Sequence, residues 1–206
     1  VAPELNDTGA AGRAGRRALS PGTRAFTLLL TAAKALIALA NDSMLPAFAE
    51  IRAHHGPAPN ANEVAPLITV FLFALGLGQL PAGLLADRFG RLPVLWGGIM
   101  LYIAGAVAAV FAPSLGWMLA ARFLWGLGAA GPRVAVHAMV RDSYAGAAMA
   151  RQMSSMLAVF LIVPMVAPVM GQAALAIGPW QGTIWLCVIA AAAVLVMSRW
   201  LPRTVP

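Results

Sequence analysis

The chain consists of six long apolar runs separated by short polar or charged segments. Each run is close to the ~20 residues that an α-helix needs to cross the ~30 Å hydrocarbon core of a membrane. A chain in lipid must satisfy its backbone hydrogen bonds internally, so a helix is the expected form of each run. The pattern therefore predicts an all-α polytopic membrane protein with transmembrane helices at about 26–49, 64–85, 94–112, 115–140, 153–177 and 180–200.

Composition supports the same class of protein. Of the 206 residues, 61% are hydrophobic and 10% are charged, whereas soluble domains carry charge at about a quarter of their positions. The one cysteine, Cys187, lies inside the sixth run, so neither a disulfide framework nor a cysteine metal site is expected. The first run resembles a signal peptide ending at Ala40, but Lys34 interrupts it and apolar residues continue to Ala49, which favours a retained helix.

The net charge of +7 is distributed unevenly along the chain. If the N-terminus is cytoplasmic, the outer segments contain Arg52 and the inner segments contain ten arginines. This asymmetry is the positive-inside pattern, and it predicts that both termini are cytoplasmic. No basic face interleaved with aromatic residues indicates a nucleic-acid partner. The inner arginines are Arg13, Arg16, Arg17, Arg24, Arg88, Arg91, Arg141, Arg151, Arg199 and Arg203.

Three regions follow from the pattern. Residues 1–24 are rich in Ala, Gly and Arg without helical periodicity, which predicts a flexible cytoplasmic tail. Residues 25–201 contain the six helices, and residues 202–206 are expected to begin a cytoplasmic linker. Glycines are frequent in the helices, where small residues let neighbouring backbones approach closely. These are Gly76, Gly78, Gly97, Gly98, Gly105, Gly126 and Gly128.

The stretch GLLADRFGRLPVL, which begins at Gly83, places charges between the second and third helices. Gly83 permits close backbone contact, and Gly90 can adopt the positive φ that a tight turn needs. Asp87 can accept hydrogen bonds from a helix N-terminus or pair with an arginine, while Arg88 and Arg91 can hold carboxylates across an interface. Charges that only stop translocation would explain the arginines but neither the aspartate nor the glycines.

This stretch resembles motif A, the signature loop of the major facilitator superfamily of secondary transporters, except that Leu92 stands where a second basic residue is usual. The resemblance implies that the six helices form the N-terminal half of that fold. It also implies that the five residues act as a latch between the halves, with the aspartate bracing the outward-open state.

A second resemblance lies in the fourth helix, in ARFLWGLGAAGPRVAVHAMVRDSY. It is similar to motif B of the same superfamily, in which the arginine, here Arg122, is implicated in proton coupling; Trp125 stands where glutamine is frequent. The following VRD is similar to the bicyclomycin-resistance (Bcr/CflA) subfamily of drug exporters. An arginine inside the membrane is costly and is expected to face a cavity or a partner.

Asp42 is the predicted partner of Arg122. At 1.5 Å per residue, Arg122 lies roughly 8 Å and Asp42 roughly 12 Å from the outer ends of their helices, so their depths agree. The D-x-x-L-P spacing at Asp42 also resembles the drug-exporter subfamily. We therefore expect Asp42 and Arg122 to couple transport to protons. The alternative is that Asn41 and Asp42 form a polar break in the helix, and Lys34 either reaches the membrane surface or offers Asp42 a second base.

The substrate cavity is interpreted as lined by four residues: Met44, Gln79, Trp125 and Arg133. Arg133 falls on one stripe of the fourth helix with Arg122 and His137, although His137 and Arg133 are also close enough to the helix end to extend into water. Gln79 serves equally well as an ordinary hydrogen bond between helices. A lining that includes Met44, Phe48 and Trp125 would suit lipophilic cations or neutral drugs.

The fifth helix contains VPMVAPVMGQ, with Pro164, Pro168 and Gly171. This segment is similar to motif C of the antiporters, although Ala167 and Gln172 replace glycines that are usual there. The resemblance implies a bent helix and export. Prolines in membrane helices are often simple kinks.

An enzyme is not expected. Intramembrane serine proteases need a G-x-S-x-G nucleophile and a histidine base, and the sequence contains no such motif. No metal-ligand cluster is present in the sequence either. The expected protein needs no cofactor and takes its energy from a proton gradient.

Superfamily members bind substrate between two six-helix halves, and the resemblance implies that this chain, which begins at Val1, corresponds to one half. We expect an inner-membrane bacterial protein with a small-molecule substrate, contacts to membrane lipid, and a second half. That half would be a missing C-terminal domain, a separate chain or a second copy. Two alternatives remain: an isolated half that binds without transporting, and an uptake transporter for another solute.

Overall fold

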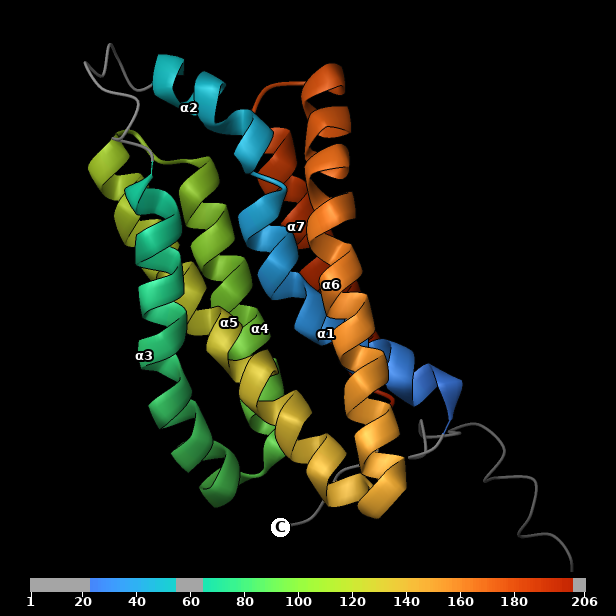
Figure 1. Ribbon diagram of the computed structural model, residues 1–206. Helices are drawn as coiled ribbons and strands as arrows, with labels where there is room; N and C mark the ends of the chain where they lie inside the picture. Colours follow the sequence, from blue (N-terminus) through green and yellow to red (C-terminus); the bar gives the residue numbers. More distant parts are fainter. Residues whose placement is uncertain (1–22, 55–64, 202–206) are drawn as a thin grey trace, which may run out of the picture.

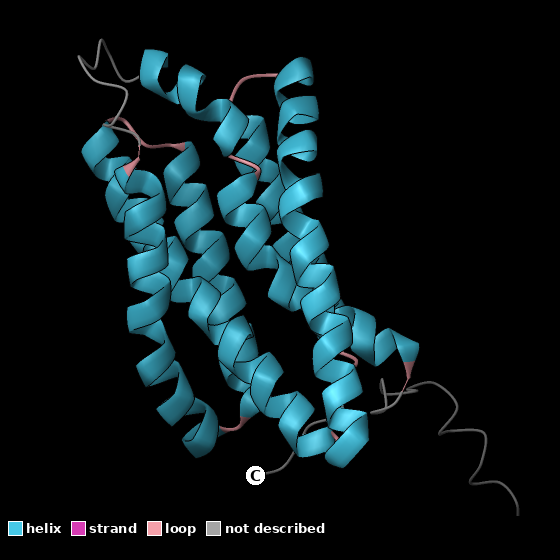
Figure 2. Cartoon of the chain, viewed as in Figure 1, coloured by secondary structure: helices cyan, strands magenta, loops and turns pink. Residues whose placement is uncertain are grey.

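The computed structural model describes residues 23–54 and 65–201, and this part of the chain is helical without strands. The predicted N-terminal tail and C-terminal linker lie outside it, apart from residues 23 and 24. Figures 1 and 2 show long helices lying side by side with short connections. In chain order the elements are α1 (Arg24–Asp42), the 3₁₀ turn η2 (Leu45–Ala47), the short helix α2 (Phe48–His54), α3 (Pro66–Phe89), α4 (Arg91–Val110), α5 (Leu115–Ser143), α6 (Gly146–Ile177) and α7 (Gln181–Ser198).

The long helices form two groups of three. In the first group, α3 and α4 each pack mainly on α5, although α3 and α4 are neighbours in the chain. In the second group, α1 packs on α6 and α7. Contacts of α1 with α5 and of α4 with α7 join the groups, and α1 and α6 lie together on the right of Figure 1. The functional side chains described below lie on both sides of this junction.

Among the described residues, five helical segments are long and apolar enough to cross a membrane: Arg24–His54, Pro66–Phe89, Arg91–Val110, Gly146–Ile177 and Gln181–Ser198. The other long helix is α5, which carries Arg122, Arg133 and Arg141. It lies between α3 and α4, and most of its middle is buried. The all-helical membrane architecture expected from the sequence is therefore confirmed.

The first predicted helix is interrupted. α1 ends at Asp42, and the chain continues through η2 into α2 instead of running unbroken to residue 49. Pro46 has no N–H with which to bond the carbonyl of Asp42, so the helical ladder cannot continue there. Ser43 covers part of the end, because both its backbone N–H and its hydroxyl donate to the Leu39 carbonyl, at 3.2 and 2.6 Å. The polar break considered from the sequence is therefore present.

The turn between α3 and α4 is one residue long. Gly90 has φ 91° and is the only residue between Phe89 and Arg91. That φ favours glycine, as the sequence predicted. α3 ends four residues later, and α4 begins three residues earlier, than the apolar runs at 64–85 and 94–112 predicted. Both helices include the charged residues next to the turn, because a helix can continue beyond its apolar residues. This turn marks the lower end of the bundle in Figure 1, called the turn end below.

Most of the glycines allow close helix packing on α5. A Cβ added at Gly105 would clash with the backbone of Trp125, and one at Gly128 with the backbone of Tyr102. The same prediction is confirmed at Gly78, Gly98 and Gly126. It is wrong for Gly76 and Gly97, where no atom lies within 4 Å of the added Cβ.

Candidate functional site

Arg122, about two turns into α5, is fully buried. Its Nη1 donates to the carbonyl oxygen of Ala40 on α1 at 3.0 Å. Its guanidinium also lies over two aromatic rings, 4.7 Å from the centroid of Trp125 and 5.4 Å from that of Phe71. Within the described part of the chain, Nε and Nη2 have no hydrogen-bond acceptor. The expectation that this arginine faces a partner is met by a carbonyl and two rings.

The position of Ala40 explains why it attracts a cation. The last four carbonyls of a helix have no partner within the helix, and Ala40 belongs to the last turn of α1. The C-terminal end of a helix also carries a partial negative charge that favours cations. Because α1 ends at Asp42, the Ala40 carbonyl has no N–H donor from a following turn of the same helix. Arg122 on α5 supplies that donor instead. The sequence predicted the matching depth but not this carbonyl.

Asp42 lies at the end of α1, two residues beyond Ala40, and is partly exposed. Across residues 23–54 and 65–201, no arginine, lysine or histidine nitrogen lies within 4.0 Å of its carboxylate. The structure therefore brings Arg122 to the segment that contains Asp42 without forming the ion pair. Lys34, eight residues before Asp42, instead has its ammonium nitrogen 5.5 Å from the ring centroid of Phe160 on α6.

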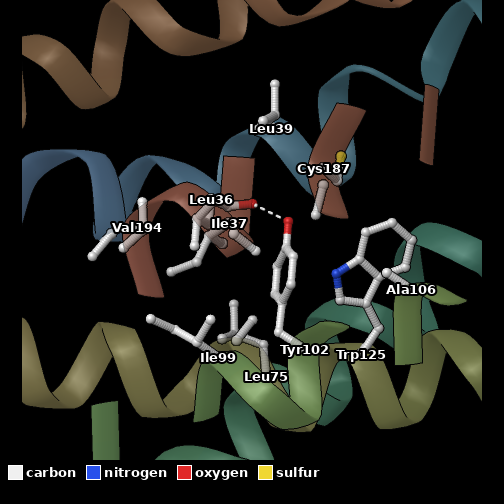
Figure 3. Close-up of a cluster of buried hydrophobic side chains, with 14 of the residues drawn as sticks. Leu36, Ile37, Leu39, Leu75, Ile99, Tyr102, Ala106, Trp125, Cys187 and Val194 are labelled. Carbon is white, nitrogen blue, oxygen red and sulfur yellow. Dashed lines mark hydrogen bonds between the residues drawn. The ribbon is translucent and has the colours of Figure 1, made fainter. Parts of the chain in front are cut away.

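An aromatic cluster holds Arg122 in place. Trp125 stands edge-on to Phe71 and to Tyr102, with ring centroids 6.2 and 5.4 Å apart. The Tyr102 hydroxyl donates to the carbonyl of Leu36 on α1 at 3.0 Å. Figure 3 shows the hydroxyl directed toward that carbonyl and the Trp125 ring beside the tyrosine. Side chains of α4 and α5 therefore reach two carbonyls of the same helix α1.

The residues of the predicted latch lie at the turn end. Arg91 Nε lies 2.7 Å from Asp142 Oδ2 at the end of α5, whereas Asp87 and Arg88 are exposed. The Arg88 guanidinium lies over the ring of Phe89. Asp142 belongs to the VRD segment already singled out, but its role as the partner of Arg91 was missed because pairing across helices cannot be read from sequence.

Gly83 differs from its prediction. The sequence indicated that Gly83 permits a close backbone contact, but no atom lies within 4 Å of a Cβ added there. That expectation is wrong for this arrangement of helices. Gly83 instead lines a cavity of about 500 Å³ between α3, α5 and α6.

Two of the four predicted cavity residues line that cavity. Gln79 and Arg133 are on its wall, whereas Met44 and Trp125 are completely buried in the core. The Gln79 amide nitrogen donates to the Leu75 carbonyl of its own helix at 3.2 Å. His137 also lines the cavity. Several other lining residues were not selected as cavity residues from the sequence, among them Arg141, Met149 and Met153.

The motif in the fifth run lies where α6 crosses the break in α1. α6 is continuous through Pro164 and Pro168. A Cβ added at Gly171 would meet the carbonyl oxygen of Ser43 and the ring of Pro46. Gly171 therefore lets α6 lie directly against the break next to Asp42. In this structure the segment VPMVAPVMGQ therefore provides the close contact between α6 and the end of α1.

The chain matches known proteins along most of its length. Residues 30–206 match the family model described as Major Facilitator Superfamily. The inward open conformation of the xylose transporter XylE from E. coli is similar in fold, with a TM-score of 0.72 over 86% of this chain and 48% of that chain, at 14% identity.

Two relatives in sequence carry the name multidrug resistance protein MdtL. One is from Escherichia coli O81 (strain ED1a) and the other from Shigella dysenteriae serotype 1 (strain Sd197). Each is 36% identical over 141 residues, which is 68% of this chain and 36% of the relative. The matched part thus spans about a third of these relatives. An integral membrane protein is consistent with both the matches and the apolar helices, and an enzyme is not. The chain belongs to the major facilitator superfamily.

Proposed function

We propose that the chain is the N-terminal six-helix half of a proton-coupled exporter of drugs or other small lipophilic compounds. The names of the MdtL relatives support drug export, and the VRD and D-x-x-L-P segments support the Bcr/CflA subfamily. The arginine distribution supports cytoplasmic termini in a bacterial inner membrane. The turn end of the bundle is then the cytoplasmic end.

The observation that carries proton coupling is the position of Arg122 beside the break in α1. The buried Arg122 guanidinium donates to the carbonyl of Ala40, which is two residues before Asp42 in the chain, and two of its nitrogens have no hydrogen-bond partner among residues 23–54 and 65–201. Arg122 has donors left for a carboxylate, and charge-assisted pairs of this kind are strong where water is excluded. The Asp42 carboxylate is partly exposed, so it can exchange a proton with water.

Two states follow from this geometry. In the described state Arg122 bonds the Ala40 carbonyl, and Asp42 stands apart from it. In the second state a deprotonated Asp42 turns toward the free donors of Arg122 and shifts the end of α1. Protonation removes that attraction and favours the first state. Since protons and substrate then bias the same equilibrium, each changes the affinity of the other.

A second six-helix half is required for alternating access. Along α6, one face carries exposed apolar side chains four residues apart, including Leu161, Met165 and Val169 at 64%, 75% and 66% exposure. Exposed apolar residues are compatible with lipid, but a face of this length also suits a second bundle. The proposed partner is a C-terminal domain, a separate chain or a second copy of this chain.

The test is efflux of a fluorescent lipophilic drug from proteoliposomes, driven by an imposed proton gradient. Asp42→Asn removes the proton-binding carboxylate, and we expect it to lower gradient-driven efflux by about tenfold or more. Glu50→Gln is the matched control, because Glu50 is an exposed acid in α2. Unchanged proton-dependent efflux by Asp42→Asn would refute the assignment.

The same assay separates the alternatives for the second half. It is run with the chain alone, with its oligomer mass measured, and with the chain joined to a second six-helix half. Efflux by a dimer of the chain supports self-pairing. Efflux that appears only after the second half is added supports a two-part transporter, and saturable drug binding without efflux in either sample supports a binding module.

A further inference from the structure

The cavity at the turn end contains a row of basic side chains. Arg133, His137 and Arg141 follow one another at intervals of four on α5, and all three line the cavity. Residues four apart lie on the same face of a helix, about 6 Å apart along its axis. The basic row is therefore about 12 Å long. It faces one open cavity, with Arg133 and His137 partly buried and Arg141 exposed at its end.

These basic groups are not neutralised within the described part of the chain. The ion pair found there within 4.0 Å joins Arg91 and Asp142, so neither guanidinium of the row has a carboxylate partner. One acid, Asp87, lines the cavity from α3. Two permanent positive charges thus share the cavity with a single carboxylate that reaches neither of them.

His137 adds a directed group to the row. Its Nδ1 lies 2.7 Å from the carbonyl oxygen of Arg133. Because a carbonyl can only accept, Nδ1 carries the hydrogen and donates it. Nε2 is then left for the cavity, as an acceptor in the neutral ring and as a donor in the protonated ring.

The opposite wall is apolar. Met149 and Met153 line the cavity from α6, one helical turn apart. Methionine side chains are flexible and polarisable, so they adapt to apolar ligands of different shapes. The cavity volume of about 500 Å³ lies within the range of roughly 300–1,000 Å³ that is usual for small-molecule sites.

We propose that this cavity binds amphipathic anions, in which a carboxylate, sulfonate or phosphate is attached to an apolar body. Arg133 and Arg141 hold the anionic group, because guanidinium groups match these oxyanions with paired donors. Met149 and Met153 contact the apolar body. The inference rests on the proposed function, of which it names a substrate class. An acid to be exported and the headgroup of an anionic phospholipid share this chemistry.

The test uses two ligands of nearly equal shape, tritiated 1-naphthoate and its uncharged amide, 1-naphthamide. Binding is measured on the purified chain in nanodiscs of phosphatidylcholine, without a gradient or a second half. We expect naphthoate to bind about tenfold more tightly than the amide, and Arg133→Gln together with Arg141→Gln to abolish this preference. Arg151→Gln is the control, since Arg151 is an exposed arginine of α6 outside the cavity lining.

Two further measurements distinguish a loss of binding from misfolding of the variant. The helical circular dichroism of the double variant is compared with that of the unchanged chain, and Arg141→Lys tests whether positive charge alone restores part of the preference. Equal binding of the two ligands by the unchanged chain would overturn the proposal. So would a preference that persists in the folded double variant or that is lost equally in Arg151→Gln.

Nanodiscs containing phosphatidylglycerol distinguish the two sources of the anion. A lipid occupant is identified by two results together. Phosphatidylglycerol competes with naphthoate, and native mass spectrometry detects retained lipid only when Arg133 and Arg141 are present. Naphthoate binding that phosphatidylglycerol leaves unchanged identifies a soluble acid. Both outcomes support the site. Because binding needs no transport, failure of the efflux assay would leave this result intact, and efflux without anion preference would refute only this inference.

Discussion

Arg91, the first residue of α4, lies with its Nε 2.7 Å from Oδ2 of Asp142, near the end of α5. The pair connects the one-residue turn after α3 to a helix that is distant in sequence. Its side chains are 16% and 33% exposed, so solvent screens the attraction only in part. Asp87 and Arg88, on the other side of the same turn, are exposed and remain available to another surface.

A double-mutant cycle of Arg91→Gln and Asp142→Asn measures this pair. We expect a coupling free energy of about 1 kcal/mol in the unfolding of the chain, reduced at high salt. Thermal or denaturant unfolding in detergent provides the four free energies. Arg88→Gln with Asp142→Asn is the matched cycle and is expected to be additive, because Arg88 does not pair with Asp142. Additivity in the Arg91 cycle would show that the contact contributes no stability.

Gly171→Ala tests whether α6 must touch the break in α1. The added methyl group would meet the carbonyl oxygen of Ser43, so α6 has to move outward. We expect unfolding stability to fall by about 1–3 kcal/mol. Gly76→Ala on α3 is the control, since nothing lies within 4 Å of its added Cβ, and its effect should be less than about 1 kcal/mol. Equal effects at the two positions would contradict the close approach.

Most of the fold could be predicted because membrane helices are encoded by long apolar runs. The predicted range 115–140 became Leu115–Ser143, and 180–200 became Gln181–Ser198. The largest difference at a helix start is in α6, which begins at Gly146 instead of about residue 153. Its first turns carry Arg151 and Gln152 among alanines and methionines, which favour helix without making an apolar run.

The site was predicted less completely, for a different reason. Residue type and depth identified Arg122, but the acceptor is a backbone carbonyl, which leaves no trace in side-chain identity. Periodicity placed Arg133 and His137 on one stripe, and Arg141 continues it, although Arg141 was interpreted only as a topology charge. The partner of Arg91 depended on how α3, α4 and α5 pack, which no local pattern specifies.

Tyr102→Phe removes one of the two hydrogen bonds that side chains of α4 and α5 donate to described carbonyls of α1. The tyrosine is fully buried, and its hydroxyl donates to Leu36 at 3.0 Å. Phenylalanine keeps the ring that packs on Trp125, so only the hydrogen bond is lost. We expect a loss of about 1 kcal/mol in unfolding stability. A loss several times larger would mean that the hydroxyl holds α1 in position instead of adding one ordinary hydrogen bond.

Arg122→Met separates a structural role of the arginine from a role in coupling. The substitution leaves the Ala40 carbonyl with one donor fewer, which costs about 1–3 kcal/mol. It also removes a buried charge, whose desolvation costs several kcal/mol. Because these effects oppose each other, we expect unfolding stability to change by no more than about 2 kcal/mol.

Efflux should respond quite differently to the same substitution. Without Arg122, protonation of Asp42 has no cation to release, so gradient-driven efflux by the assembled transporter should fall to background, and Asp42→Asn should then have no additional effect. Arg151→Met is the control for loss of an arginine elsewhere on the chain. The opposite outcome is that Arg122→Met unfolds much of the protein while the fraction that stays folded still shows gradient-driven efflux. Arg122 would then be a structural cap on α1, and the proton would have to act through another group.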